Sequence, residues 1–199
     1  MKVYITSNRY QNLAAKVAAY SFSRFGYETQ IINVEDFDKI KSNFKKKYLK
    51  KGKIKIFEDD LQSFTFLRFL IPSHFKSKDL ILIIDPDIFA IKDPSDLIKE
   101  FKQKNHIHCT FLNEKPRTEL MLVDPNNIDW NFDEIINKIF NFKLDYNDLF
   151  SLNFNSKNKI EKIDNKFNEL DKIKDSSVIL HTTQRITQPW KLGLKVDFQ

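Results

Sequence analysis

The sequence predicts an α/β fold with a mostly parallel central sheet, in one domain that spans residues 1–199. Strand-like and helical patterns alternate from the first residues onward. KVYIT (residues 2–6) is extended, QNLAAKVAAYSFSRFG (residues 11–26) has apolar residues at helical spacing, and TQIINV (residues 29–34) is extended again. Further along, DLILII (residues 79–84) is apolar on both faces, as a strand that is covered on both sides must be.

The other elements are predicted from local signals. Gly26 is a good terminator for the first helix, because glycine readily adopts the backbone conformation that closes a helix. Residues 58–72 (EDDLQSFTFLRFLIP) predict a largely buried helix that ends at Pro72. Asp93 is the expected N-cap of a helix that starts at Pro94. The remaining expected elements are strands at residues 107–112, 118–124 and 176–180, and helices around residues 128–140 and 146–153.

Composition limits the chemistry that this chain can carry. Lys and Arg together number 33 and Asp and Glu 27, so the formal net charge is +6, which favours an anionic partner such as a nucleotide, a polyphosphate, nucleic acid or an acidic membrane surface. Only three glycines occur, which excludes a glycine-rich phosphate loop of the Walker or dinucleotide type. Cys109 is the single cysteine, which excludes an intrachain disulfide and a cysteine-based zinc site.

Hydropathy predicts a soluble, cytoplasmic protein. No apolar run approaches the roughly 18 residues of a membrane-spanning helix, and the opening MKVYITSNRY lacks a secretory apolar core. The lysine-rich stretch at residues 41–57 leaves two interpretations open: a solvated loop or helix face, or a patch for an anionic acceptor. Under the second interpretation, the segment from Lys45 to Lys55 binds an anionic acceptor or makes a peripheral contact with a membrane.

Two carboxylates follow the most apolar strand of the chain. Asp85 and Asp87 flank Pro86 directly after the run that ends at Ile84. Residues i and i+2 of an extended segment project to the same side, so both carboxylates would face one point beyond the strand's carboxyl end, where open α/β sheets bind ligands. A hard divalent cation such as Mg²⁺ or Mn²⁺ would relieve their mutual repulsion. The alternative is that Asp-Pro-Asp is only a turn that closes the strand.

A second group of candidate residues lies on other elements. His181 ends the last expected strand and is followed by Pro189 and Trp190; a lone histidine there is commonly structural, but its combination with the Asp85–Asp87 pair is far less expected by chance than either part. Arg68 lies among apolar residues of its helix, where it either extends to the surface or reaches a ligand anion. Three further residues are interpreted as structural: His106, His108 and Cys109.

Several segments, in order along the chain, resemble one known family. They are VYITSNRYQNLAAKVAAYS, FTFLRFLIPSHFKSKDLILIIDPDIFAIKDPSDL, TELMLVDPNNIDW, NDLFSLNF, IDNKFNEL and HTTQRITQPW. Together they resemble the glycosyltransferases of the GT-A fold, most closely family 8, which includes lipopolysaccharide galactosyltransferases and glycogenin. The resemblance covers nearly the whole chain. It implies a GT-A fold and the transfer of a sugar from a nucleotide sugar to an acceptor.

The resemblance also implies roles for individual residues. Asp85, Asp87 and His181 would together bind one Mn²⁺ or Mg²⁺, which would bridge the diphosphate of the donor, expected to be a UDP-sugar. The expected acceptor is a glycan or a lipid-linked molecule, nucleic acid is not an expected partner, and the expected stereochemistry is retention. The other implied site residues are Thr6 and Asn8 at the nucleoside, Arg68 facing the donor, and Asp148 beside the transferred sugar as the candidate catalytic residue.

The sequence departs from the family pattern at three places. The replacements are Gln188 for the closing lysine that pairs with the diphosphate, Leu149 for a glutamine, and Arg117-Thr118-Glu119 for an Asn-x-Gly. Arg185 or Lys191 would supply the charge that Gln188 lacks. These departures leave the donor sugar and the acceptor open, and they admit an inactive relative.

Two alternatives come from other classes of protein. A phosphohydrolase of the haloacid dehalogenase type also places Asp-x-Asp after an apolar strand, but that motif opens its fold, whereas 84 residues precede Asp85 here, and Phe89 takes the place of the usual Thr or Val. A basic nucleic-acid-binding protein would use the lysine-rich stretch. Its binding would weaken steeply with salt and would not depend on Asp85 and Asp87.

Overall fold

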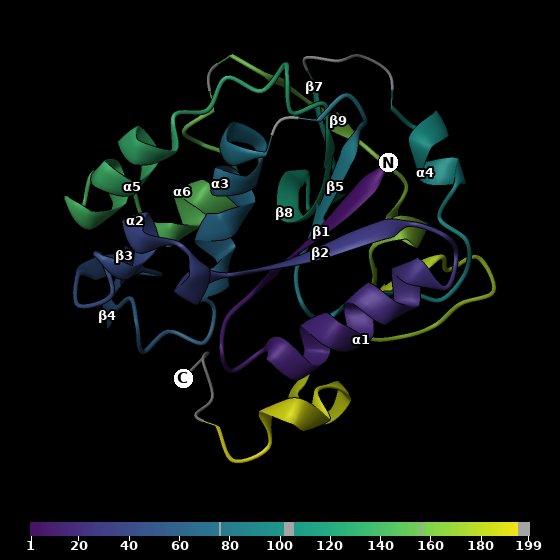
Figure 1. Cartoon of the computed structure of the whole chain (residues 1–199), viewed down its shortest axis with the longest axis horizontal. Helices are drawn as coiled ribbons and strands as arrows, with labels where there is room; N and C mark the ends of the chain where they lie inside the picture. The colour runs from purple at the N-terminus through teal and green to yellow at the C-terminus, as the bar shows by residue number, and fades with distance from the viewer. Residues whose placement is uncertain (76, 102–105, 156, 195–199) are drawn as a thin grey trace.

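The structure, a computed structural model, describes residues 1–75, 77–101, 106–155 and 157–194. Within these residues, a six-stranded sheet with the order β2-β1-β5-β8-β7-β9 runs through the centre of the molecule (Figure 1). Its strands are β1 (Lys2–Ser7), β2 (Glu28–Asn33), β5 (Ile81–Ile84), β7 (His106–Leu112), β8 (Lys115–Val123) and β9 (Lys159–Lys162). β1 is parallel to β2 and β5, β9 is parallel to β7, and β8 is antiparallel to both β5 and β7. The predicted α/β fold with a mostly parallel central sheet is confirmed.

Helices cover both faces of this sheet. The main ones are α1 (Asn12–Ser23), α3 (Leu67–His74) and α5 (Phe132–Phe140). On one face, α1 shares an apolar core with Leu82 and Ile84 of β5. On the other face, α3 and α5 share a core with Ile81 and Ile83. Because alternate residues of a strand face opposite sides, β5 needs the unbroken apolar run from which it was predicted.

A second sheet, with three strands among the described residues, positions the predicted site. Its strands in spatial order are β10 (Glu169–Leu170), β11 (Ile179–His181) and β6 (Ile88–Ala90). β11 runs antiparallel to β6, so that His181 stands opposite Ile88, the residue after Asp87. Of these three strands, the sequence predicted only β11. The pairing of β11 with β6 brings the C-terminal part of the chain next to Asp87.

The lysine-rich stretch forms a β-hairpin instead of the expected loop or helix face. β3 (Lys47–Lys50) pairs antiparallel with β4 (Lys53–Ile56). Lys50 is buried, and its Nζ lies 2.8 Å from a carboxylate oxygen of Asp60. The run is therefore not solvated throughout, because period-2 alternation turns part of it towards the core.

Several other element boundaries differ from those expected. Helical structure within residues 58–72 begins with a 3₁₀ turn at Ser63–Phe66, and α3 continues past Pro72. Pro72 removes one hydrogen-bond donor from the helix, and the burial of the residues around it outweighs that loss. The helix expected from Pro94 begins later, as α4 (Asp96–Lys99), and Asp93 accepts a hydrogen bond from the Ser95 amide in the turn before it. The last part of that expected helix, residues 102–104, lies outside the described residues.

The remaining elements are short. α5 begins four residues later than residue 128, because the Asn131 side chain accepts a hydrogen bond from the Glu134 amide and caps the helix there. The others are α2 (Asp38–Lys41), α6 (Tyr146–Phe150), and the 3₁₀ turns η1 (Val34–Asp36), η3 (Asn165–Phe167), η4 (Arg185–Thr187) and η5 (Pro189–Lys191). Among the described helices, none combines the length and the apolar character needed to cross a membrane.

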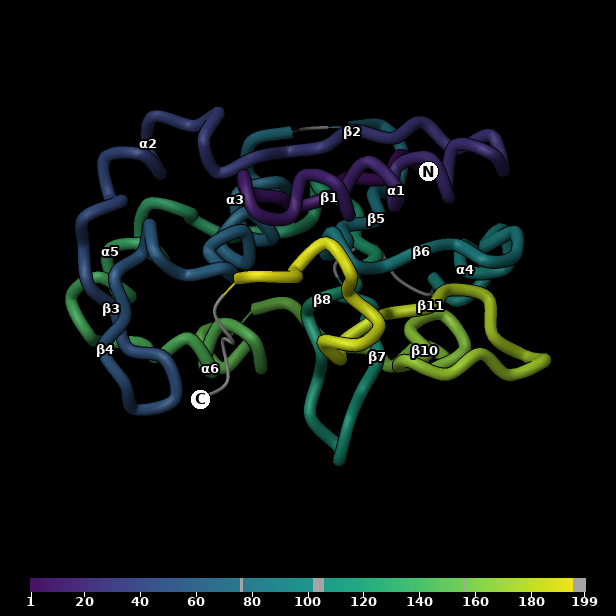
Figure 2. The backbone as a smooth tube through the Cα atoms, turned by 90° about the horizontal axis from the view of Figure 1, so that it is seen from below, coloured from purple at the N-terminus to yellow at the C-terminus, as the bar shows by residue number. Residues whose placement is uncertain are grey.

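The elements divide between two ends of the molecule. The β3–β4 hairpin lies with α2, α5 and α6 at one end, and α4 lies at the other, with the central strands between them (Figures 1 and 2). The C-terminal segment, yellow in Figure 2, passes in front of the central strands in that view.

Candidate active site

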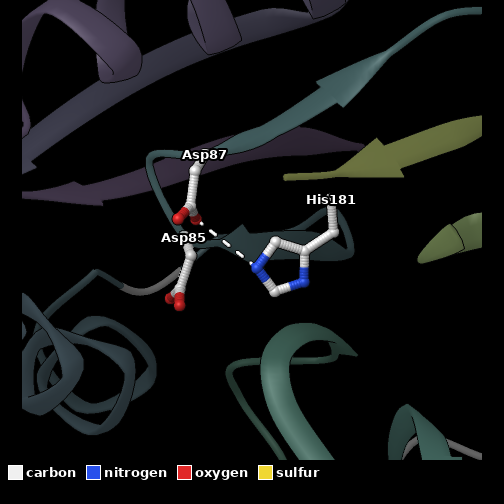
Figure 3. A group of neighbouring side chains, drawn as sticks. All are labelled: Asp85, Asp87 and His181. Carbon is white, nitrogen blue, oxygen red and sulfur yellow. Dashed lines mark ion pairs between the residues drawn. The ribbon is translucent and has the colours of Figure 1, made fainter. Parts of the chain in front are cut away.

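The candidate site begins where β5 ends. Asp85 directly follows β5, and Pro86 and Asp87 form a turn that leads into β6. β11 carries His181 to the same place (Figure 3). One ligand atom from each of Asp85, Asp87 and His181 lies within 4.8 Å of the others, and His181 Nε2 is 3.5 Å from Asp87 Oδ1. The convergence that the sequence predicted for these three residues is therefore present.

A cavity of about 250 Å³ contains these side chains. It lies beyond the carboxyl ends of β1 and β5, where Thr6 Oγ1 is 3.4 Å from Asp85 Oδ1. Its charged lining residues are the cations Lys51, Arg68, Arg117 and Lys191 and the carboxylates Asp85, Asp87 and Glu119. A cavity with this excess of fixed cations, before any metal is added, suits an anionic ligand.

Arg68 and Asp85 form a buried ion pair inside the cavity. Arg68 Nε donates to Asp85 Oδ1 at 2.8 Å, its second terminal nitrogen contacts Oδ2, and the first donates to Thr118 Oγ1 at 2.8 Å. Arg68 is only 2% exposed, so it does not extend to the surface. Burial raises the pKa of Asp85 to about 6, because desolvation outweighs the opposing charge of Arg68.

Asp87 and His181 stabilise each other's charged forms. Burial alone would raise the pKa of Asp87, but the 3.5 Å contact with His181 and its charge, with the charge of Lys191, hold it below its usual value. Burial alone would lower the pKa of His181, but the contact with Asp87 and its charge raise it above its usual value. A divalent cation bound here would take the place of the imidazole proton as the positive partner of Asp87.

The C-terminal segment closes over Asp87. Gln188 Nε2 donates to Asp87 Oδ2 and to the Thr182 carbonyl, each at 2.6 Å, and Lys191 Nζ is 3.9 Å from Asp87 Oδ2. Asp171 anchors the start of this segment, because its carboxylate accepts hydrogen bonds from Thr183, Gln184 and Thr187. The polar contacts of one carboxylate thus fix the path that carries Gln188 and Lys191 into the cavity.

Glu119 brings a further carboxylate to the cavity. Glu119 lies in β8, where its neighbour Leu120 pairs with Ile84 of β5. The Asp85 amide donates to the Glu119 carbonyl at 2.9 Å. The Glu119 side chain contacts the guanidinium of Arg117 and accepts from Asn168 Nδ2 at 3.4 Å. Its exposure is 1%. The position where the resembling family has an Asn-x-Gly therefore holds a buried ion pair.

The three converging residues fit a divalent metal. Two carboxylates and an imidazole form a donor set that suits a transition metal such as Mn²⁺ better than Mg²⁺, which prefers oxygen ligands alone. Within the described residues, the buried Oδ1 of Asp87 has no hydrogen-bond partner, which leaves a ligand atom open for a cation. Asp85 has four lone-pair directions in its carboxylate, of which the contacts of Arg68 use two.

Comparison with solved structures identifies the fold. GlyE of Streptococcus pneumoniae superposes with a TM-score of 0.61 at 13% identity, over 95% of this chain and 58% of that one. The galactosyltransferase LgtC, solved with donor and acceptor sugar analogues, gives 0.60 at 11%, over 93% and 88%. Mouse xyloside xylosyltransferase 1 gives 0.57 at 11%, over 90% and 96%. This chain has the GT-A glycosyltransferase fold.

The GT-A fold confirms what the order of motifs implied about architecture. No family model and no curated protein matches the sequence. At 11–13% identity the likeness is one of fold alone. The chain also spans only 58% of the length of the GlyE structure.

Within this GT-A fold, the other predicted site residues differ in their surroundings. Arg68 and Lys191 line the cavity together with Asp85, Asp87 and His181. Asn8 is buried beside it, where its amide donates to the Leu61 carbonyl and its oxygen accepts from the Gln11 amide. Arg185 donates to the Leu194 carbonyl and is not among the lining residues. Of the two replacements considered for the missing lysine, Lys191 is the one in the cavity.

Asp148, the predicted catalytic residue, caps a helix. Its Oδ2 accepts from the Asp145 amide at 2.8 Å, and its Oδ1 accepts from Asn153 Nδ2 at 3.0 Å. The neighbouring Asn147 lines the cavity, and Asp148 is not among the lining residues. Its catalytic role stays a prediction, and it requires this capping box to open or the acceptor to approach from the side of α6.

Sequence reasoning missed several lining residues. Arg117 and Glu119 were noted only as departures from a motif, although charged residues next to the apolar run LMLV were a signal that could have marked them as candidates. Lys51 and Tyr146 come from the hairpin and from α6. Nothing local in the sequence indicates that the hairpin and α6 both contribute side chains to this cavity.

Proposed function

We propose that this protein is a metal-dependent glycosyltransferase that uses a nucleotide sugar, with a UDP-sugar as the expected donor. The observation that carries the proposal is the convergence of Asp85, Asp87 and His181 at the carboxyl end of β5, in a cavity that is also lined by four Lys and Arg side chains, within a GT-A fold. No observation among the described residues favours the phosphohydrolase or the nucleic-acid-binding alternative.

The reaction makes clear what the cavity has to do. Transfer breaks the bond between the anomeric carbon and the diphosphate, so negative charge develops on the leaving group and positive charge on the sugar. A divalent cation held by Asp85, Asp87 and His181 would act as a Lewis acid towards that diphosphate. Lys191 and Arg68 add fixed positive charge to the same cavity. With this arrangement the diphosphate needs no glycine-rich loop, and retention of configuration remains the expected outcome.

The proposed acceptor is a glycan or a lipid-linked molecule that approaches past the β3–β4 hairpin. Lys51, in the turn of the hairpin, lines the cavity, and the amides of Lys51 and Gly52 lie 3.4 Å from the Asp145 carboxylate. The outer face of the hairpin exposes Ile54 and Ile56 among lysines. This combination of apolar and basic groups beside the cavity supports a peripheral contact with an anionic membrane.

Titration of UDP into the protein tests the proposal. Calorimetry with and without Mn²⁺ should show metal-dependent binding in the native protein and none in Asp87→Ala. Asp93→Ala is the matched control, because Asp93 is a carboxylate in the turn before α4 and does not line the cavity. A panel of UDP-sugars should then identify a donor by the release of UDP in the presence of acceptors.

Two results would contradict the proposal in different ways. Binding of UDP with Mn²⁺ but no turnover of any sugar would identify an inactive relative. No binding of any nucleotide diphosphate with Mn²⁺ or Mg²⁺ would overturn the glycosyltransferase assignment.

A further inference from the structure

We propose that Glu119 is a positioning residue for the metal site: it accepts the Nδ1 proton of His181 and so holds the imidazole with Nε2 facing the metal. This inference rests on the metal site of the proposed function. It concerns a residue that the resembling family's motif does not supply, because Glu119 stands where that motif has glycine.

The strand register places Glu119 next to the metal-site residues. β8 runs antiparallel to β5, and the hydrogen bond from the Asp85 amide to the Glu119 carbonyl ties the two backbones together where β5 ends. Arg117 and Asn168 both contact Oε1 of Glu119, so the carboxylate is itself held in place. Glu119 is therefore a rigid feature of the cavity wall.

The two nitrogens of His181 face two different carboxylates. Nε2 is 3.5 Å from Asp87 Oδ1, and Nδ1 is 3.8 Å from Glu119 Oε1. A histidine that binds a metal through one nitrogen commonly donates its other N–H to a carboxylate, which fixes the tautomer and the ring orientation. The arrangement around His181 matches that pattern, with Asp87 on the metal side and Glu119 behind.

Both residues still have a polar atom available for this hydrogen bond. Among the described residues, His181 Nδ1 and Glu119 Oε2 are both buried and have no hydrogen-bond partner. A buried polar atom without a partner is costly, so the two have reason to pair. The 3.8 Å distance joins Nδ1 to Oε1, the oxygen that Arg117 and Asn168 also contact, and it is longer than a hydrogen bond. Because the carboxylate is held in place, the imidazole ring is the group that has to move, by an amount on the order of 0.5–1 Å, to donate to it.

The competing explanation is that Glu119 only neutralises Arg117. Under that explanation, removal of Glu119 changes stability and general electrostatics, but it does not act through His181. The two explanations differ in whether the effect of Glu119 depends on the presence of the imidazole, and a double-mutant cycle measures that dependence.

The experiment measures the affinity for Mn²⁺ alone by electron paramagnetic resonance. We expect Glu119→Ala to weaken Mn²⁺ binding by about 10–100-fold, the usual effect of removing the carboxylate behind a ligating histidine. Glu119→Gln, which keeps an acceptor oxygen, should recover most of that loss. In the His181→Ala background, Glu119→Ala should change the affinity less than about twofold. Glu161→Gln is the matched control, because Glu161 lies 3.2 Å from His106 at a distance from the cavity.

The result that would overturn the inference is an equal loss in both backgrounds, or no loss in Glu119→Ala. If Glu119→Ala fails to fold because Arg117 is left unpaired, the double variant Glu119→Met/Arg117→Met removes both charges together and takes its place in the cycle.

A metal-free measurement separates this inference from the proposed function. In the native protein without metal, nuclear magnetic resonance should detect a slowly exchanging proton on Nδ1 of His181, and Glu119→Ala should lose it. If the native protein binds no Mn²⁺, the proposed metal-dependent function is contradicted. The Nδ1 proton then decides by itself whether Glu119 holds His181, and its absence in the native protein overturns the contact.

Discussion

At the scale of single residues, the site depends on buried charges that are stable only in combination. Arg68 and Asp85 lie almost entirely out of water and satisfy each other with paired hydrogen bonds. Taking either charge out of water is costly, so the removal of one partner leaves the other uncompensated. The same carboxylate belongs to the proposed metal site, so the stability of the ion pair should depend on metal binding.

Substitution of Arg68 should therefore lower stability and increase the response to metal. We expect Arg68→Met to lose about 3–5 kcal/mol of unfolding free energy without metal, because Asp85 is left buried and unpaired. Added Mn²⁺ should restore more stability to this variant than to the native protein, since it supplies the missing positive charge. Denaturant unfolding with and without Mn²⁺ measures both effects.

The control for this prediction is a buried ion pair away from the cavity. Lys50→Met breaks the Lys50–Asp60 pair, and Lys50 does not line the cavity. It should lose stability, and Mn²⁺ should add no more stability to it than to the native protein, because its metal site is unchanged. If Mn²⁺ stabilises both variants equally, the link between Arg68 and the metal site is wrong.

At the scale of elements, the β3–β4 hairpin has two faces with different roles. Tyr48 and Lys50 are buried and anchor it, whereas Ile54 is 61% exposed and Ile56 40% exposed. The register pairs Ile56 with Lys47 on the outer face. Exposed isoleucines in a lysine-rich hairpin suit the boundary of an anionic bilayer, where apolar side chains enter the membrane and the ammonium groups meet lipid headgroups.

We expect the protein to co-sediment with vesicles that contain phosphatidylglycerol and to remain in solution with phosphatidylcholine alone. The double variant Ile54→Ser/Ile56→Ser should bind at least about tenfold more weakly, since each isoleucine contributes on the order of 1–2 kcal/mol when buried in the bilayer. Ile173→Ser is the matched control: Ile173 is also exposed, at 65%, but lies outside the hairpin. Equal binding to both vesicle types would contradict the membrane contact.

At the scale of the whole molecule, one sheet joins two apolar cores. The same strand, β5, contributes Ile81 and Ile83 to one core and Leu82 and Ile84 to the other, and then leads to Asp85 and Asp87. Neither core can be lost without exposing this strand. We therefore expect residues 1–199 to unfold as one domain, with the metal site as part of the cooperative unit.

Thermal unfolding tests that expectation. Far-UV and near-UV circular dichroism should report one coincident transition. Mn²⁺ at about 100 times its dissociation constant should add about 2.7 kcal/mol and raise the Tm by roughly 5–10 °C. Chelation with EDTA should reverse the shift, and Asp87→Asn should show none. Two separate transitions, with only one of them sensitive to metal, would show that the chain is not a single domain.

Much of the fold was predictable because its signals are local. The apolar run before Asp85 specified a buried central strand, and helical spacing specified α1. Element ends were less predictable, because capping by Asn131 and the tolerance of Pro72 inside a buried helix depend on contacts made after folding. The β3–β4 hairpin was missed, since its lysines conceal the period-2 pattern of Tyr48 and Lys50.

The sequence by itself pointed to two carboxylates after an apolar strand as a candidate metal pair, and its resemblance to a known family added a histidine after another strand. Only the tertiary structure decided that these residues meet, because β11 pairs with β6 across nearly half of the chain. It also decided that Arg68 is bound to Asp85, that Asp148 caps a helix, and that Glu119 lies behind His181. Composition and periodicity act between neighbours along the chain, whereas burial, ion pairing and ligand geometry are set by which strands lie side by side.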